Sequence, residues 1–126
     1  MAALFGEIIL KDTADQEFGS VISSASMESE QIRKIAQDTN DLIMFYITES
    51  EIYILGDNRS VLYPLNSEFD TETICKVYSK TKFNELLDRG QNSITNIELR
   101  ENTLTVTNGN YTLEYGSNCP PFCTNQ

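Results

Sequence analysis

The sequence predicts one α+β domain over residues 1–126, built mainly from an antiparallel sheet of about seven or eight strands with two α-helices packed on one face. Three observations predict this class. The second half of the chain alternates apolar and polar residues, the apolar run at 42–47 is too short for a core helix, and only two segments combine helical spacing with start and stop signals. The chain has 126 residues, of which 40% are hydrophobic, so it can build a core of its own.

The first quarter of the sequence gives the least definite pattern. Residues 4–11 are mostly apolar and predict a short strand, and residues 12–17 form a polar break. Apolar residues recur at helical spacing in the next stretch, but Gly19 and several serines disfavour a helix. We therefore expect a second strand near 17–24, paired with the first. One long helix from Thr13 is the alternative.

The middle of the chain predicts a helix followed by a meander of three strands. A stripe of isoleucines over 27–38, preceded by Ser26 as a candidate N-cap, indicates a half-buried helix. The apolar run at 42–47 predicts a central strand covered on both faces. Strands at 51–55 and 61–63 return on either side of a turn at 56–60.

The last third predicts one more helix and a set of regular strands. A strand at 73–78 precedes a helix at 82–89, which Thr81 can cap and Gly90 can end. Three alternating strands follow, with tight turns at 101–102 and 108–109. Residues 116–126 have no apolar period, so we expect an irregular C-terminal tail.

Composition excludes several kinds of chemistry. The chain has no histidine, so a Ser-His or Cys-His nucleophile, a histidine zinc site and imidazole acid–base catalysis are all excluded within this chain. No glycine-rich phosphate loop or calcium-loop spacing occurs. We therefore expect no catalytic residues, no metal site and no cofactor.

The net charge of −10 and the isoelectric point near 4.3 restrict the partners. Nine basic residues against 19 acids cannot supply the phosphate contacts that nucleic-acid binding requires, and an anionic membrane is disfavoured for the same reason. No apolar run is long enough to span a bilayer, and the first residues do not resemble a secretory leader. We expect a cytoplasmic protein.

The three cysteines are Cys75, Cys119 and Cys123. An odd number of thiols in a reducing compartment favours free cysteines. A bridge between Cys119 and Cys123 is the alternative, although the two prolines between them restrict such a small ring.

The most informative functional pattern is a stretch of acids without any cation. No lysine or arginine lies between Lys34 and Arg59. Acids on predicted turns, with one strand tyrosine as an aromatic anchor, are typical of a face that steers a basic protein. The predicted partner-binding residues are Asp38, Asp41, Glu49, Glu51, Tyr53 and Asp57.

This pattern favours a non-catalytic acidic interaction module with a basic protein partner. Inhibitors and immunity proteins of nucleic-acid-cutting toxins, and DNA-mimicking proteins, share this size and charge as classes. Two other interpretations stay open. One is a small-ligand or enzyme domain with a pocket between sheet and helices. The other is a structural subunit that forms a homo-oligomer through a sheet edge.

Overall fold

The computed structural model describes residues 5–48, 51–64, 67–69, 73–101 and 103–119, in which three α-helices are interspersed among runs of strands. This confirms the α+β class with antiparallel strands. The strands are β1 (Glu7–Leu10), β2 (Val21–Glu28), β3 (Leu42–Ile47), β4 (Ile52–Leu55), β5 (Val61–Tyr63), β6 (Cys75–Ser79), β7 (Ile94–Arg100), β8 (Leu104–Asn108), β9 (Tyr111–Glu114) and β10 (Ser117–Cys119). The helices are α1 (Lys11–Phe18), α2 (Ser29–Ala36) and α3 (Lys80–Gly90), with a short 3-10 turn at Asp57–Arg59.

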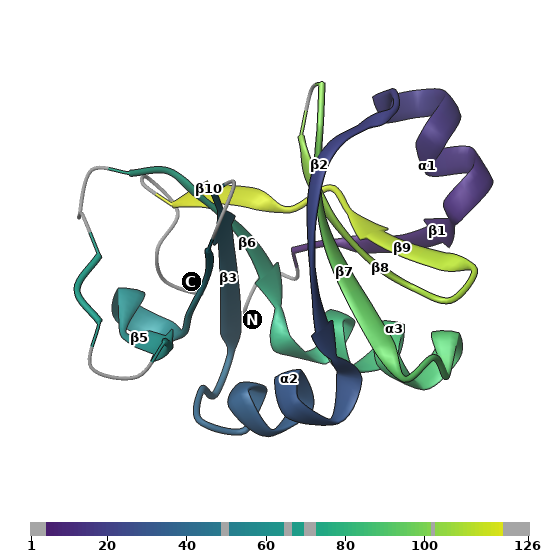
Figure 1. The fold of residues 1–126 in the computed structure, drawn as a ribbon. Coiled ribbons are helices and arrows are strands. Elements are labelled where there is room, and N and C mark those ends of the chain that lie inside the picture. The colour runs from purple at the N-terminus through teal and green to yellow at the C-terminus, as the bar shows by residue number, and fades with distance from the viewer. Residues whose placement is uncertain (1–4, 49–50, 65–66, 70–72, 102, 120–126) are drawn as a thin grey trace.

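The strands form two separate sheets where the sequence predicted one. Sheet A has the order β1-β9-β8-β7-β2, and sheet B has the order β10-β6-β3-β4-β5. Figure 1 shows the two sheets side by side, with α2 and α3 below them. The described strands also outnumber the predicted seven or eight, and α1 makes a third helix where two were expected.

The two sheets are connected along one side and open along the other. On the connected side, the backbone N–H of Ser79 donates to the carbonyl oxygen of Phe5 at 2.8 Å, and the chain passes directly from β9 to β10. Gly116 makes this passage, because a Cβ there would lie only 2.5 Å from the carbonyl oxygen of Val77. On the open side, β2 and β5 end their sheets without pairing with each other.

The main core lies between the inner faces of the sheets and is closed from below by α2 and α3. Ile32 and Ala36 of α2 and Phe83, Leu86 and Leu87 of α3 are buried, as their helical spacing predicted, and Ile35 is partly buried. The strand predicted to be covered on both faces is β3, in which five of six residues are buried. Its outer side belongs to a second apolar cluster. The core members are Met27, Ile32, Ala36, Ile43, Phe45, Ile47, Ile54, Tyr78, Phe83, Leu86, Leu87, Ile97, Leu104, Val106 and Leu113.

The N-terminal segment differs from the prediction. The polar break is helix α1, and β2 pairs with β7, so the expected pairing of the first two strands is wrong. Helix α1 crosses the outer face of sheet A and carries the chain from β1 at one edge to β2 at the other. Its only fully buried side chain is Ala14, so it has no apolar stripe that could have predicted it.

The C-terminal segment is partly regular. Residues 117–119 form β10, which pairs with β6, so the tail predicted at 116–126 is regular at its start. The rest of that tail, with Cys123, lies outside the described residues. The thiol of Cys75 is buried and free, and Cys119 is its register partner across the β6–β10 pair.

Burial predicts that the Cys75 thiol reacts slowly. Desolvation raises its pKa to about 11, so little thiolate forms at neutral pH. In a variant that carries Cys119→Ser and Cys123→Ser, the remaining thiol should resist iodoacetamide at pH 7.5 and react fully once urea unfolds the chain. Equal alkylation rates in the folded and unfolded protein would contradict the buried position.

Candidate functional site

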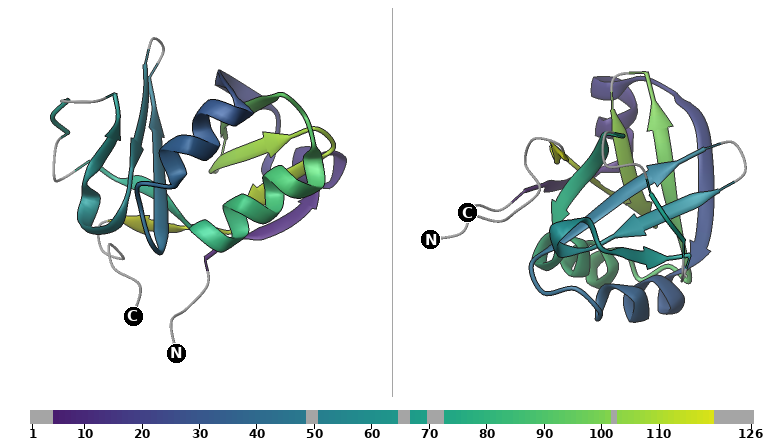
Figure 2. Two further views of the ribbon diagram at one scale, coloured as in Figure 1. Left: turned by 90° about the horizontal axis from the view of Figure 1, so that it is seen from below. Right: turned by 90° about the vertical axis from the view of Figure 1, so that its left-hand side faces the viewer.

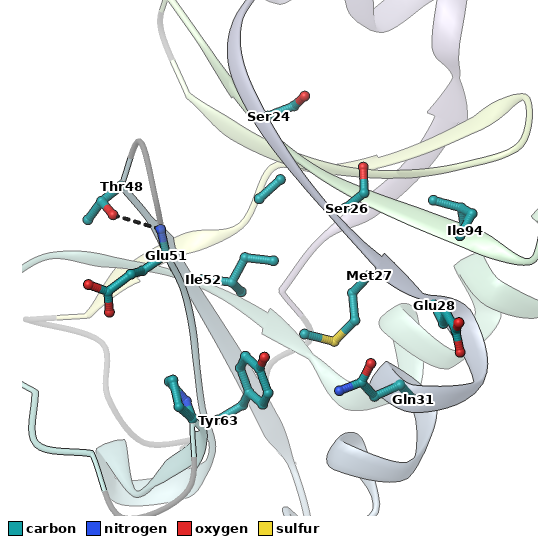
Figure 3. A pocket seen from close by; sticks show the side chains of 12 residues that line it. Ser24, Ser26, Met27, Glu28, Gln31, Thr48, Glu51, Ile52, Tyr63 and Ile94 are labelled. Atoms are coloured by element: carbon teal, nitrogen blue, oxygen red, sulfur yellow. Dashed lines mark hydrogen bonds between the residues drawn. The ribbon is translucent and has the colours of Figure 1, made fainter.

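An open groove of about 750 Å³ lies on the open side of the molecule, between the last strands of the two sheets. One wall is β2 of sheet A, and the other comes from the β3–β4 hairpin and the end of β5 in sheet B (Figure 3). We call it the edge groove. Its lining residues are Ser24, Ala25, Ser26, Met27, Glu28, Gln31, Thr48, Glu51, Ile52, Tyr63, Pro64 and Ile94.

Strand β2 presents its backbone edge to this groove. Five consecutive residues, Ser24–Glu28, line it. Successive side chains of a strand point to opposite faces of the sheet. Consecutive residues can therefore line the same groove only where the edge of the strand faces that groove. That edge has no partner strand within the described residues, since β2 ends sheet A.

The side chains around the edge groove divide into an apolar floor and a polar rim. Figure 3 shows Met27, Ile52 and Tyr63 pointing toward one another, whereas Ser24 and Ser26 point away from them. The charged residues of the lining are both acids, Glu28 and Glu51. The arrangement can therefore hold an extended, partly apolar segment beside a free strand edge, with negative charge around it.

The predicted site residues lie in two groups rather than in one. Asp38 and Asp41 are exposed in the connection from α2 to β3, whereas Glu51 is exposed where the β3–β4 hairpin returns. The length of β3, six residues or roughly 20 Å, separates these ends. Glu49 lies outside the described residues.

The Asp57 carboxylate stabilises the fold through hydrogen bonds to backbone N–H groups. It accepts hydrogen bonds from the backbone N–H groups of Asn40 (3.0 Å), Asp41 (3.2 Å) and Leu42 (2.9 Å). The 56–60 turn is thereby fastened to the start of β3, in agreement with the predicted turn. This carboxylate stabilises the loop that presents Asp38 and Asp41.

Tyr53 belongs to an aromatic cluster on the outer face of sheet B. Its ring lies 5.0 Å from that of Phe69 and 6.4 Å from that of Tyr46, measured between centroids. Its hydroxyl donates to Glu51 Oε2 at 2.6 Å, and this bond raises the pKa of the phenol. Tyr53 and Glu51 therefore form a pair, as a combined aromatic and acidic anchor requires.

A buried polar layer that the sequence analysis missed lies between α1 and sheet A. Arg100 is 1% exposed, and its guanidinium donates to Asp15 Oδ1 at 2.7 Å and to Glu98 Oε1 at 3.2 Å. Its Nε donates to Thr105 Oγ1 at 3.0 Å, and Thr107 also donates to Glu98 Oε1. The alternation of polar and apolar residues along β7 and β8 is the signal that could have predicted this layer, because the polar side of such a sheet can be covered by a helix as well as by solvent.

Glu114 is the unbalanced member of this layer. The residue is fully buried, and neither carboxylate oxygen has a hydrogen-bond partner. Burial and the neighbouring acids Glu17 and Glu7 raise its pKa to about 7.

The described cavities do not enclose these carboxylates. Besides the edge groove, a groove of about 560 Å³ lies between α2 and the end of α3, and an apolar cleft of about 240 Å³ lies between the sheets near Leu99 and Leu104. Neither Glu98 nor Glu114 lines any of the three. Within the described residues, no three Cys, Asp or Glu side chains gather closely enough to hold a metal ion. None of the described helices is both long and apolar enough to cross a bilayer.

Removing the Arg100 guanidinium should destabilise the domain strongly. Arg100→Met leaves Glu98 buried without its cation, which typically costs about 3–5 kcal/mol. Arg33→Met is the matched control, because Arg33 pairs with exposed Asp88 and such pairs contribute about 1 kcal/mol or less. Urea unfolding measures both variants, and equal losses of stability would contradict the role of the buried layer.

Glu114 should destabilise the folded domain at neutral pH but not in mild acid. Its folded-state pKa of about 7 lies above the ordinary value near 4.5, so the destabilisation is absent below pH 4.5, grows between 4.5 and 7, and is complete above 7. Glu114→Gln should therefore raise the free energy of unfolding relative to the wild type more at pH 7.5 than at pH 4.5. The pair of urea curves at each pH measures this difference. Parallel pH profiles of the two proteins would show that Glu114 does not titrate in this range.

Comparison with known proteins gives no relative from which a role could be transferred. No protein-family model matches the chain, and no curated protein or solved structure matches it either.

Proposed function

We propose that this protein is a non-catalytic interaction module that presents exposed acids to a basic protein partner. The observation that carries the proposal is that the described lysines and arginines form ion pairs with acids outside the predicted site and with none of the described acids inside it. Six of the nine basic residues form ion pairs with carboxylates of the described chain: Lys11, Arg33, Lys34, Lys82, Arg89 and Arg100.

The other three basic residues are also engaged or partly covered. Lys80 donates to the carbonyl oxygen of Thr39 at 2.8 Å, and Arg59 donates to that of Thr73 at 3.0 Å. Lys76 is half-buried, and burial lowers its pKa. The ion-paired acids, Asp15, Glu30, Glu85, Asp88 and Glu98, all lie outside the predicted site, so the chain's own cations leave the acids of that site without a described counter-ion.

The acids near the predicted site keep their charge toward solvent. Asp38, Asp41 and Glu51 are exposed and make no ion pair with any described residue. Unpaired surface charge of one sign raises the rate at which an oppositely charged partner is encountered. This supports a docking face for a basic protein.

The alternative of a small-ligand enzyme has less support. An acid or base catalyst needs a perturbed titratable group in contact with a cavity. The strongly perturbed carboxyl group is Glu114, which lies in the layer under α1 and lines none of the described cavities. A homo-oligomeric subunit is opposed by the repulsion between two chains of charge −10.

Neutralising the exposed acids should slow association with the partner. The variant Asp38→Asn, Asp41→Asn, Glu51→Gln keeps Asp57, which supports the loop. For a partner captured from the source cell extract at low salt, the on-rate should fall roughly tenfold at 20 mM salt, with a smaller change in the off-rate. Stopped-flow fluorescence at 20 and 300 mM salt measures both rates.

A second triple variant, Glu7→Gln, Asp12→Asn, Glu101→Gln, removes the same total charge from exposed acids elsewhere. It should slow association less than the first variant does. If both variants slowed association equally, the total charge of the chain would determine the on-rate, and the position of the acids would not. A captured partner that is acidic, or an on-rate that is the same for the wild type and the first variant, would overturn it.

A further inference from the structure

We infer that the edge groove binds an extended basic peptide segment, which adds as a strand to the free edge of β2. The inference rests on the proposed function and specifies how the partner is held. In strand addition, backbone hydrogen bonds to an exposed edge give affinity, and pockets for alternate side chains give specificity.

The β2 edge differs from the other edges of the two sheets. The described edge strands β1, β5 and β10 have four, three and three residues, and Pro64 directly follows β5. Strand β2 has eight residues and contains neither lysine nor proline. Short edges, lysines and prolines are the devices that prevent edge pairing, and β2 has none of them beyond an irregularity in register between Val21 and Ser23.

The groove beside β2 has the form that an added strand needs. Residues Ser24–Glu28 span roughly 17 Å, enough to pair with about five residues of a peptide. One side of that peptide would meet the apolar floor of Met27, Ile52 and Tyr63, and its other side would face solvent beside the exposed serines. The partner segment should therefore alternate apolar residues toward the floor with polar or charged residues outward.

The charge around the edge groove favours a basic peptide segment over a second copy of this chain as the occupant. The charged lining residues are both acids: Glu28 lies on β2 itself, whereas the Glu51 carboxylate points away from the apolar floor and accepts a hydrogen bond from Tyr53. The groove lining contains no lysine or arginine. A second copy would bring its own charge of −10 and its own acidic rim to the same edge. Lysine or arginine at the outward positions of a peptide would instead be attracted from the first encounter.

The direct test uses a capped seven-residue synthetic peptide in which valine alternates with lysine. Two further peptides carry N-methyl groups either on all valines or on all lysines. Because alternate N–H groups of a strand point to opposite edges, only one of these sets faces β2. The parent peptide should bind, and one N-methylated peptide should bind at least about tenfold more weakly than the other.

Two readouts locate the binding. Backbone amides within Ser24–Glu28 should exchange hydrogen more slowly when the parent peptide is present. Ser24→Lys places a cation on the groove rim and should weaken binding about tenfold, whereas Thr81→Lys, which adds the same charge at the exposed start of α3, should change it by less than about twofold.

The outcomes separate this inference from the proposed function. If both N-methylated peptides bind like the parent, or the β2 amides stay unprotected, strand addition is wrong, although acid-dependent association with a partner can still hold. If the β2 amides become protected by the peptide while acid neutralisation leaves the partner's on-rate unchanged, strand addition holds and the charged docking face fails. Protection that rises with protein concentration without peptide would assign the edge to a second copy and overturn the inference.

Discussion

The bridge that the Arg100 guanidinium makes between Asp15 and Glu98 is the interaction on which the arrangement of the edges depends. It fixes α1, a helix with little apolar surface, to the outer face of sheet A. Because α1 carries the chain across that face, it also determines that β2 lies at the edge opposite β1. The free edge and the groove beside it therefore follow from a buried ion pair on the other side of the same sheet.

The fold distributes its charges in a consistent manner. Most of the described cations pair with surface acids outside the predicted site, whereas Asp38, Asp41 and Glu51 have no ion pair within the described residues. Asp57 is an acid with a structural role, because its carboxylate accepts the hydrogen bonds that stabilise the loop from which Asp38 and Asp41 project. Glu114 is the exception among the acids, because it is buried without a hydrogen bond, and its place beside Glu7 and Glu17 adds repulsion to the cost of desolvation.

The sequence predicted the elements whose stability comes from apolar periodicity. Helices α2 and α3, the doubly covered β3 and the hairpins of β7, β8 and β9 all have such patterns. Helix α1 was missed because Ala14 and an ion pair with Arg100, 85 residues away, hold it in place. Asp38, Asp41 and Glu51 form no ion pair within the described residues, but the length of β3 separates the two aspartates from Glu51. No sequence pattern predicts the edge groove, because it forms where small side chains of β2 meet residues of the other sheet.

The termini of the described chain give a practical consequence of the connected side. Phe5 bonds to Ser79 at the end of β6, and Cys119 of β10 pairs with Cys75 at its start, so the first and last described segments both lie along β6. The right-hand view of Figure 2 places β6 and β10 on the side of the molecule away from β2. A probe attached to the side of β6 and β10 would therefore leave the unpaired edge of β2 accessible.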